Sequence, residues 1–227
     1  MLLGDFGTSW TKIYDSESRE YGLVPARGSR DLRVDVATGH NAGLHSEKKV
    51  GELVAMVQGG IKLIGGDFAM LDIGGRDMKF VEVHDKKVTR MEWNTQCGAM
   101  TGFTLELVGK YFDVNFSDIP PASKGYPMTC GVLGMERAFD DMSTGTDPVE
   151  AVARLAAGIA VAAHKFIGSL ERFHLSGGMC DNPLFVESFP EGVQVVPMGR
   201  FVLVEGLTLE MESRSDVKDV VAGMKSQ

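Results

Sequence analysis

Two short stretches, residues 5–12 and 72–79, each combine an aspartate, a glycine turn and a lysine at the same offset from the aspartate. An aspartate at such a turn can reach the water shell of a magnesium ion, and backbone N–H groups and hydroxyls can bind phosphate oxygens. One copy alone is also typical of a plain hairpin turn. The internal repeat favours a strand–turn–strand phosphate clasp that occurs twice. The matching residues are Asp5 with Asp72, Gly7 with Gly74, and Lys12 with Lys79.

A third reactive group is Cys97, which directly precedes an amphipathic run that predicts a helix starting near Gly98 to Thr101. The positive end of the helix dipole would lower the pKa of a thiol there and make the thiolate a better nucleophile or metal ligand. Taken alone, the pattern fits a small buried cysteine at a tight turn equally well.

The other two cysteines, Cys130 and Cys180, do not form a C-x-x-C pair with Cys97 or with each other. Three separate cysteines argue against a disulfide framework or an all-cysteine zinc site within one chain. A metal site shared between two chains stays open. By themselves, Cys130 reads as a buried residue at a helix start and Cys180 as a packing residue.

The elements that must position these groups alternate between strands and helices. Strands are expected on both sides of each clasp, and a helix over residues 46–64 with Ser46 as N-cap. Its expected apolar side is Val50, Leu53, Val54, Val57 and Ile61. A long helix is expected from Pro148 to Arg172, followed by a strand that ends in a Gly177-Gly178 turn, where the backbone could lie against a nucleobase or ribose.

Composition excludes several classes of protein. A net charge of −8 over 227 residues argues against general nucleic-acid binding, which needs a basic surface. The sequence contains no run of about 18 apolar residues, so no membrane span is expected. The first residues lack a basic region followed by a cleavable apolar region, so we expect a cytoplasmic protein.

In order along the chain, these motifs resemble the BadF/BadG/BcrA/BcrD ATPase family, whose best-known members activate 2-hydroxyacyl-CoA dehydratases. The resemblance covers about residues 2 to 207. Its most specific parts are the Asp-Ile-Gly-Gly-x-Asp-x-Lys and Cys-Gly-Ala-x-Thr-Gly segments. The segments that carry it are Asp5-x-Gly7-Thr8-Ser9, residues 72–79, Asn94-x-x-Cys97 with residues 98–102, Cys130, and Ser176-Gly177-Gly178-x-x-x-Asn182.

The resemblance implies an α/β fold of two RNase H-like lobes, as in acetate kinase, sugar kinases, heat-shock chaperone ATPases and actin, with ATP and Mg²⁺ in the interlobe cleft. The expected boundaries are residues 1–66 for a minimal first lobe, 67–210 for the second lobe and 211–227 for a tail. The resemblance also implies a homodimer in which one [4Fe–4S] cluster is held by Cys97 and Cys130 of each subunit. ATP hydrolysis would then drive low-potential electrons to a client redox enzyme.

Residue roles also follow from the resemblance alone. Asp5 and Asp72 would organise the magnesium ion and the attacking water, and Thr101 and Gly102 would lie near the γ-phosphate. Three further residues, Gly177, Gly178 and Asn182, would line the adenosine. The expected phosphate-binding residues are Gly7, Thr8, Ser9, Lys12, Gly74 and Gly75.

Four departures from the family pattern indicate a divergent branch, the first being that the acidic pair usual a few residues after the second cysteine reads Met135-Glu136-Arg137. The segment between the first clasp and Thr38 is short. The family's Thr-Gly-Tyr-Gly-Arg turn reads Thr38-Gly39-His40-Asn41, without the arginine, and the closing small-residue helix carries bulkier side chains over residues 199–206. Two alternative hypotheses are therefore kept beside the electron-donor hypothesis. One is a small-molecule kinase or ATPase of the same fold with structural cysteines, and the other is a nucleotide-binding regulatory subunit.

Overall fold

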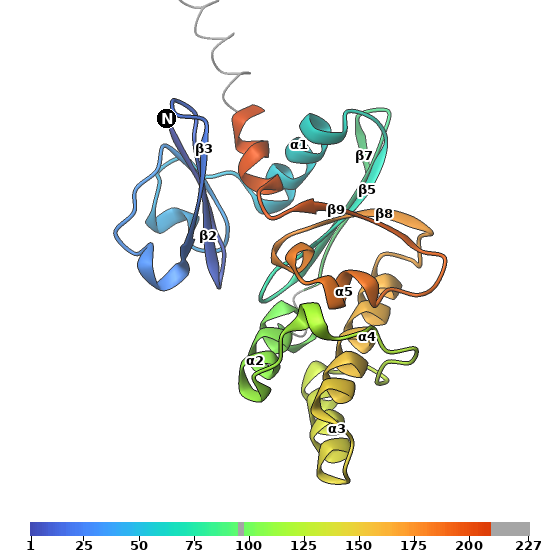
Figure 1. The fold of residues 1–227 in the computed structure, drawn as a ribbon. Coiled ribbons are helices and arrows are strands. Elements are labelled where there is room, and N and C mark those ends of the chain that lie inside the picture. The colour runs from blue at the N-terminus through green and yellow to red at the C-terminus, as the bar shows by residue number, and fades with distance from the viewer. Residues whose placement is uncertain (95–97, 210–227) are drawn as a thin grey trace, which may run out of the picture. The chain divides into compact units, whose positions relative to one another are not determined.

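The structure, a computed structural model, describes residues 1–94 and 98–209. These residues form two compact units, each with its own sheet (Figure 1). The first unit contains residues 1–67, residues 84–87 and the described residues from Phe201 onward. The second contains the described residues of 68–83 and 88–200.

The first unit is built on a four-stranded sheet in the order β3-β2-β1-β4. Strands β1 to β3 are antiparallel, and β4 runs parallel to β1. A small core around Phe6, Val34 and Ala37 lies beside the sheet. The strands are β1 (Leu2–Phe6), β2 (Trp10–Asp15), β3 (Glu20–Pro25) and β4 (Val36–Thr38), with 3₁₀ turns at Ala26–Gly28 and Ala42–Leu44.

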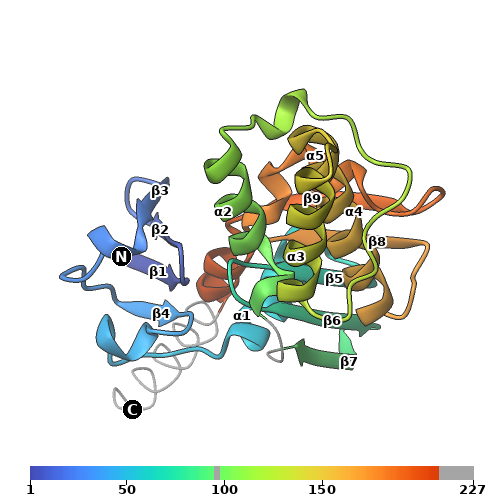
Figure 2. The same cartoon turned by 90° about the horizontal axis from the view of Figure 1, so that it is seen from below.

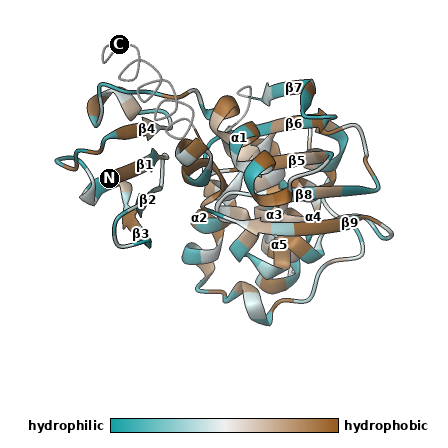
Figure 3. Ribbon diagram, turned by 90° about the horizontal axis from the view of Figure 1, so that it is seen from above, coloured by the Kyte–Doolittle hydropathy of each residue, from teal (hydrophilic) through white to brown (hydrophobic). Residues whose placement is uncertain are grey.

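The second unit repeats this order in its sheet, β7-β6-β5-β8-β9, and extends it by one parallel strand, β9. Strand β5 occupies the place of β1, so the repeat seen in the sequence is a repeat of topology. Figure 3 shows hydrophobic residues along β5 and β9. The strands are β5 (Phe68–Ile73), β6 (Met78–His84), β7 (Lys87–Asn94), β8 (Arg172–Ser176) and β9 (Gln194–Gly199).

Helices of the second unit pack together beside its sheet (Figure 2). The central one, α4, begins at Pro148, where the Asp147 side chain accepts a hydrogen bond from the Val149 N–H as predicted for an N-terminus. It ends at Phe166 rather than Arg172, because Gly168 and Ser169 adopt positive φ. The helices are α2 (Gly102–Phe112), α3 (Gly131–Ser143), α4 (Pro148–Phe166) and α5 (Pro183–Glu187), and the 3₁₀ turns are η3 (Gly98–Met100), η4 (Phe116–Asp118) and η5 (Gly178–Asp181).

Helix α1 (Glu52–Ile64) starts later than the sequence predicted. Ser46 is not its N-cap, since Gly51 takes that position. The chain before it is held extended: Lys49 forms a parallel bridge with Ala37, and the Val50 N–H donates to the Ala37 carbonyl. Pairing with β4 therefore outcompetes the first turn of the expected helix.

The buried face of α1 also differs from the predicted one. Ala55, Met56 and two glycines are buried, whereas Val54 is 48% exposed. The reason is a close helix contact with residues 202–209, which are helical. A β-carbon at Gly59 would lie 2.1 Å from the Val202 carbonyl oxygen, so only a glycine permits this approach. Apolar side-chain periodicity could not reveal a face made of small residues.

Within residues 1–94 and 98–209, no helix combines the length and the apolar character that crossing a membrane requires.

Candidate nucleotide site and cysteine segments

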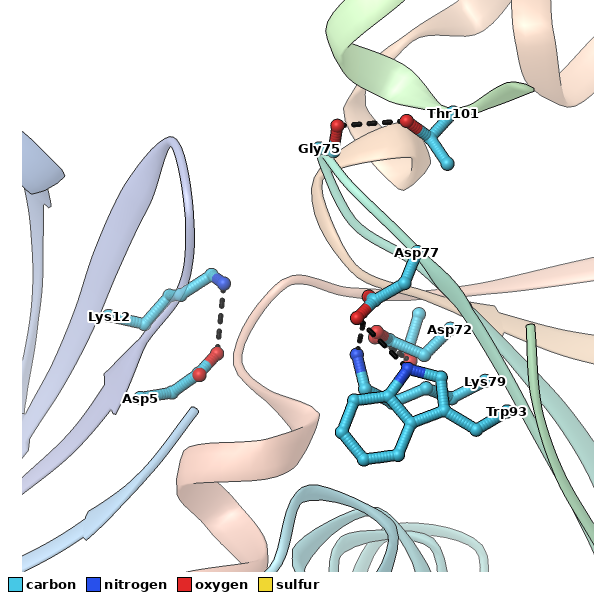
Figure 4. Close-up of polar contacts among 9 residues, drawn as sticks. Asp5, Lys12, Asp72, Gly75, Asp77, Lys79, Trp93 and Thr101 are labelled. Atoms are coloured by element: carbon cyan, nitrogen blue, oxygen red, sulfur yellow. Dashed lines mark hydrogen bonds and ion pairs between the residues drawn. The ribbon is translucent and has the colours of Figure 1, made fainter. Parts of the chain in front are cut away.

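The first clasp, residues 5–12, lies at the turn between β1 and β2. Asp5 and Lys12 are direct partners across the antiparallel ladder. The Lys12 Nζ atom lies 2.8 Å from Asp5 Oδ2 (Figure 4), and Asp5 is only 4% exposed. Within the turn, Thr8 is exposed and Gly7 and Ser9 are partly exposed. The turn can therefore offer backbone N–H and hydroxyl groups to an anion beside a buried carboxylate.

A buried hydroxyl beside Asp5 adds a residue that the sequence did not single out as a site residue. Thr38 is the ladder partner of Asp5 on β4, and its side chain is fully buried. Among the described residues, its Oγ1 atom has no hydrogen-bond partner. Buried polar groups normally have one, so an orphaned hydroxyl next to a clasp fits a site that a ligand or its water shell would complete.

The second clasp, residues 72–79, has the same strand register but different side-chain contacts. Asp72 and Lys79 are ladder partners, as Asp5 and Lys12 are. However, Lys79 Nζ lies 2.6 Å from Asp77 Oδ1, and Asp72 Oδ1 accepts a hydrogen bond of 2.6 Å from Ser176 Oγ at the end of β8. The first aspartate is thus held by a cation and the second by a neutral hydroxyl. The two copies of the clasp are chemically distinct.

Trp93 joins this arrangement from β7. Its Nε1–H donates to Asp77 Oδ2 at 3.0 Å, and Lys79 Nζ lies 5.2 Å from the centroid of its ring (Figure 4). Asp77 and Lys79 are buried and Trp93 is 44% exposed. This contact was not predicted, since Trp93 stands at the end of an alternating strand and has the pattern of an ordinary strand residue.

The second clasp also contacts the start of α2. Thr101 Oγ1 donates to the Gly75 carbonyl at 2.8 Å, and the Gly102 N–H donates to the Gly74 carbonyl at 3.1 Å. The predicted site residues Asp72, Gly74, Gly75, Thr101 and Gly102 therefore gather at one place in the second unit. The predicted residues of the first clasp gather in the first unit.

The predicted adenosine segment follows β8. Gly177 has a φ of 89°, and a β-carbon there would lie 2.5 Å from the Ile73 carbonyl oxygen, so the turn packs directly onto β5. Asn182 Oδ1 accepts from the Phe185 N–H and caps α5. Between them, the Cys180 thiol donates to the Leu175 carbonyl, and burial raises the pKa of this thiol to about 12. Cys180 behaves as a packing residue.

Of the two predicted cluster ligands, Cys97 lies outside the described residues. Cys130 is the N-cap residue of α3 and is partly buried. Gly131, which follows Cys130, contacts Ala99, which lies two residues after Cys97: a β-carbon at Gly131 would lie 2.1 Å from the carbonyl carbon and oxygen of Ala99. In the part of the chain that is described, no group of three or more His, Cys, Asp or Glu side chains could hold a metal ion. A site that takes two thiolates from each of two chains would not produce such a group in one chain.

No protein-family model matches the chain. Its sequence is 24% identical over 178 residues to the (R)-2-hydroxyglutaryl-CoA dehydratase activating ATPase of Acidaminococcus fermentans, covering 73% of this chain and 68% of that protein. The chain resembles an activating ATPase. This similarity confirms the resemblance predicted from the motifs.

Solved structures of two dehydratase activators share the fold. The activator of the 2-hydroxyisocaproyl-CoA dehydratase from Clostridium difficile, with bound ADPNP, aligns with a TM-score of 0.78 at 18% identity over 96% of this chain and 97% of that one. The (R)-2-hydroxyglutaryl-CoA dehydratase component A from Acidaminococcus fermentans gives 0.72 at 20% identity, over 91% and 95%. The predicted α/β class with two RNase H-like units, shared with activating ATPases and sugar kinases, is confirmed.

Proposed function

We propose that this protein is an ATP-hydrolysing activator that delivers low-potential electrons to a client redox enzyme. The similarity to an activating ATPase supports the ATP-dependent activator role. The observation that carries the electron-donor part is the contact between Gly131 and Ala99, which joins the segment after Cys97 to the segment after Cys130. A small-molecule kinase with structural cysteines would not require these segments to meet.

In this proposal the protein binds Mg²⁺-ATP through residues of the clasps. Asp5 and Asp72 would hold the metal's water shell and orient the attacking water, Lys12 would offset the charge of Asp5, and the glycine turns would bind phosphates. The unpartnered Thr38 hydroxyl beside Asp5 supports a ligand at this place. Nucleotide would supply the free energy, because a ligand that binds two conformations unequally shifts the balance between them.

Cys97 and Cys130 would ligate one [4Fe–4S] cluster together with the same two residues of a second copy, and the cluster would carry the electron. Cys130 suits this role because it stands at the N-terminus of α3, where the helix dipole favours an anionic ligand. Cys180 is assigned no part in the cluster, since its partly buried thiol donates to the Leu175 carbonyl and burial raises its pKa.

An exposed apolar face on α2 and α3 supports a second copy of the chain as the partner. Phe103, Leu107 and Tyr111 are spaced four apart on α2 and are 51%, 51% and 73% exposed. Phe139 of α3 extends this stripe, with its ring centroid 6.0 Å from that of Tyr111. The stripe begins six residues after Cys97, so a copy seated on it would also bring its own cysteines near.

The first test is the iron and sulfide content, with visible and EPR spectra, of protein purified without oxygen. We expect about four irons per dimer in the wild type, lost in Cys97→Ala and in Cys130→Ala. Cys180→Ala is the matched control and should keep the iron. Protein that holds no cluster even after chemical reconstitution would exclude the electron-donor role.

The dimer has a separate test. Leu107→Glu should give a monomer by analytical ultracentrifugation, because a charge would replace an apolar side chain at the contact. Val88→Glu changes an exposed valine on β7 and should leave the dimer intact. A wild-type monomer that carries a full cluster would contradict the shared site.

One observation favours the kinase alternative. A cavity of about 610 Å³ lies in the second unit between the loop at Pro120-Pro121 and α4, with Lys124, Glu150 and Arg154 among its lining residues. This volume suits a small molecule. The iron measurement separates the two functions, since a kinase would keep phosphoryl transfer without any cluster.

A further inference from the structure

The turn of the second clasp, residues 74–77, is hydrogen-bonded to the chain on both sides of Cys97. Upstream, Asp77 accepts from the Trp93 indole N–H at 3.0 Å, and Trp93 is four residues before Cys97. Downstream, Gly75 accepts from Thr101 Oγ1 at 2.8 Å, and Thr101 is four residues after Cys97. One short turn therefore holds Trp93, before the cysteine in the sequence, and Thr101, after it.

The Trp93–Asp77 and Thr101–Gly75 hydrogen bonds can transmit a movement of this turn to the residues around Cys97. Asp77, Lys79 and Thr101 are 8%, 3% and 1% exposed, so these members of the contacts are buried, whereas Trp93 is 44% exposed. A hydrogen bond to a buried carboxylate is among the stronger ones in a protein, and leaving such a group unpaired is costly. If the whole turn from Gly74 to Asp77 shifts when phosphate binds, Trp93 and Thr101 must shift with it or lose these bonds.

We infer that Trp93 is a positioning residue that couples nucleotide at the second clasp to the segment carrying Cys97. It acts through Asp77, which Lys79 fixes by an ion pair of 2.6 Å. The indole thus connects the turn to the residues before Cys97, and the Thr101–Gly75 hydrogen bond connects it to the residues after Cys97. This inference rests on the proposed function, because it requires nucleotide to bind at the clasp.

The difference between the two clasps supports this assignment. In the first clasp, the lysine pairs with the aspartate opposite it. In the second, the lysine pairs with Asp77, and the other carboxylate oxygen of Asp77 receives the indole of the neighbouring strand. The second copy thus contacts β7, the strand that precedes Cys97 in the sequence.

The experiment measures hydrogen exchange of peptides covering residues 94–101 in cluster-free protein, with and without Mg²⁺-ADPNP, beside the nucleotide Kd. In the wild type, we expect bound nucleotide to change the exchange rate of these peptides. Trp93→Phe keeps the ring but removes the donor. It should reduce the ratio of the exchange rates measured with and without nucleotide by about tenfold, because a hydrogen bond to a charged acceptor contributes a free energy of about that size. The Kd should stay unchanged.

The matched control is Glu92→Gln, the neighbour of Trp93 on β7, whose carboxylate contacts Arg90 and not the clasp. It should behave as the wild type. A merely structural role for Trp93 would alter exchange equally with and without nucleotide and would lower the Tm, so the ratio and the Tm are both measured. Asp77→Asn gives a second variant, which should also reduce the ratio.

A Trp93→Phe protein that keeps the wild-type ratio would overturn the inference, as would a wild type that binds nucleotide without any change at residues 94–101. Neither result would remove the proposed function, because nucleotide binding would persist. A wild type that binds no nucleotide would remove both.

Discussion

Gly131 touches Ala99 so closely that a β-carbon would lie 2.1 Å from the Ala99 carbonyl carbon and oxygen. The start of α3 and the turn η3 can therefore approach one another only because residue 131 is a glycine. This contact connects two parts of the chain that are more than thirty residues apart and that each follow a cysteine.

Gly131→Ala should force these two segments apart. We expect a loss of about 1–3 kcal/mol in the free energy of unfolding, typical of overpacking, measured by urea denaturation. Protein that still folds should bind less iron on reconstitution. Gly66→Ala is the control, because a β-carbon there would meet no atom within 4 Å. Full iron content in Gly131→Ala would show that the spacing of the two segments is not critical for the cluster.

Thr38→Val separates a structural from a ligand-binding role for the buried hydroxyl. The change keeps the branched shape and removes a polar atom that has no partner among the described residues. Stability should stay the same or rise by up to about 1 kcal/mol, since an unsatisfied buried polar group is destabilising. The Kd for Mg²⁺-ADPNP, measured by calorimetry, should rise at the same time. A lower Tm with an unchanged Kd would mean that the hydroxyl serves the fold.

Cys180 should resist alkylation. Its partly buried thiol donates to the Leu175 carbonyl, and a pKa of about 12 leaves almost no thiolate at pH 8. Peptide mass spectrometry after iodoacetamide treatment of cluster-free protein should find Cys130 labelled well before Cys180. In urea, both should react at similar rates. Rapid labelling of Cys180 in folded protein would contradict its assignment as a packing residue.

His174 should make stability depend on pH on the acid side. Burial lowers the pKa of this imidazole below its usual 6.5, so the unfolded chain binds a proton more readily than the folded one. Its contribution to stability is complete above pH 6.5 and is lost as the pH falls below that value. The Tm should therefore fall between pH 6.5 and 5, and His174→Gln should reduce this slope. An equal slope in the variant would assign the dependence to other groups.

The sequence predicted the repeated clasp correctly, because a matching offset between aspartate and lysine requires a matching ladder register. Asp5 with Lys12 and Asp72 with Lys79 are indeed ladder partners. It could not predict which aspartate each lysine contacts. Lys79 contacts Asp77, and the other carboxylate oxygen of Asp77 accepts a hydrogen bond from Trp93. This contact depends on the side-chain conformations of three residues, which the spacing of residue types along the sequence does not specify.

The errors at α1 have a similar origin. Ser46 is a good capping residue, but the segment after it pairs with β4 through the Lys49–Ala37 bridge. The buried face was missed because Gly59 carries no apolar side chain, and its value lies in the space it leaves for Val202. Patterns of hydrophobicity report side chains that fill space, not positions where two backbones meet.

The contact between α1 and residues 202–209 also has a consequence for biosynthesis. Helix α1 leaves the ribosome early, but the helix that packs against Gly59 is made only after the whole second unit. During translation, Ala55 and Gly59 therefore lack this packing partner until residues 202–209 have been made. The order of synthesis makes the second unit the one that can fold first, and the first unit reaches its final packing last.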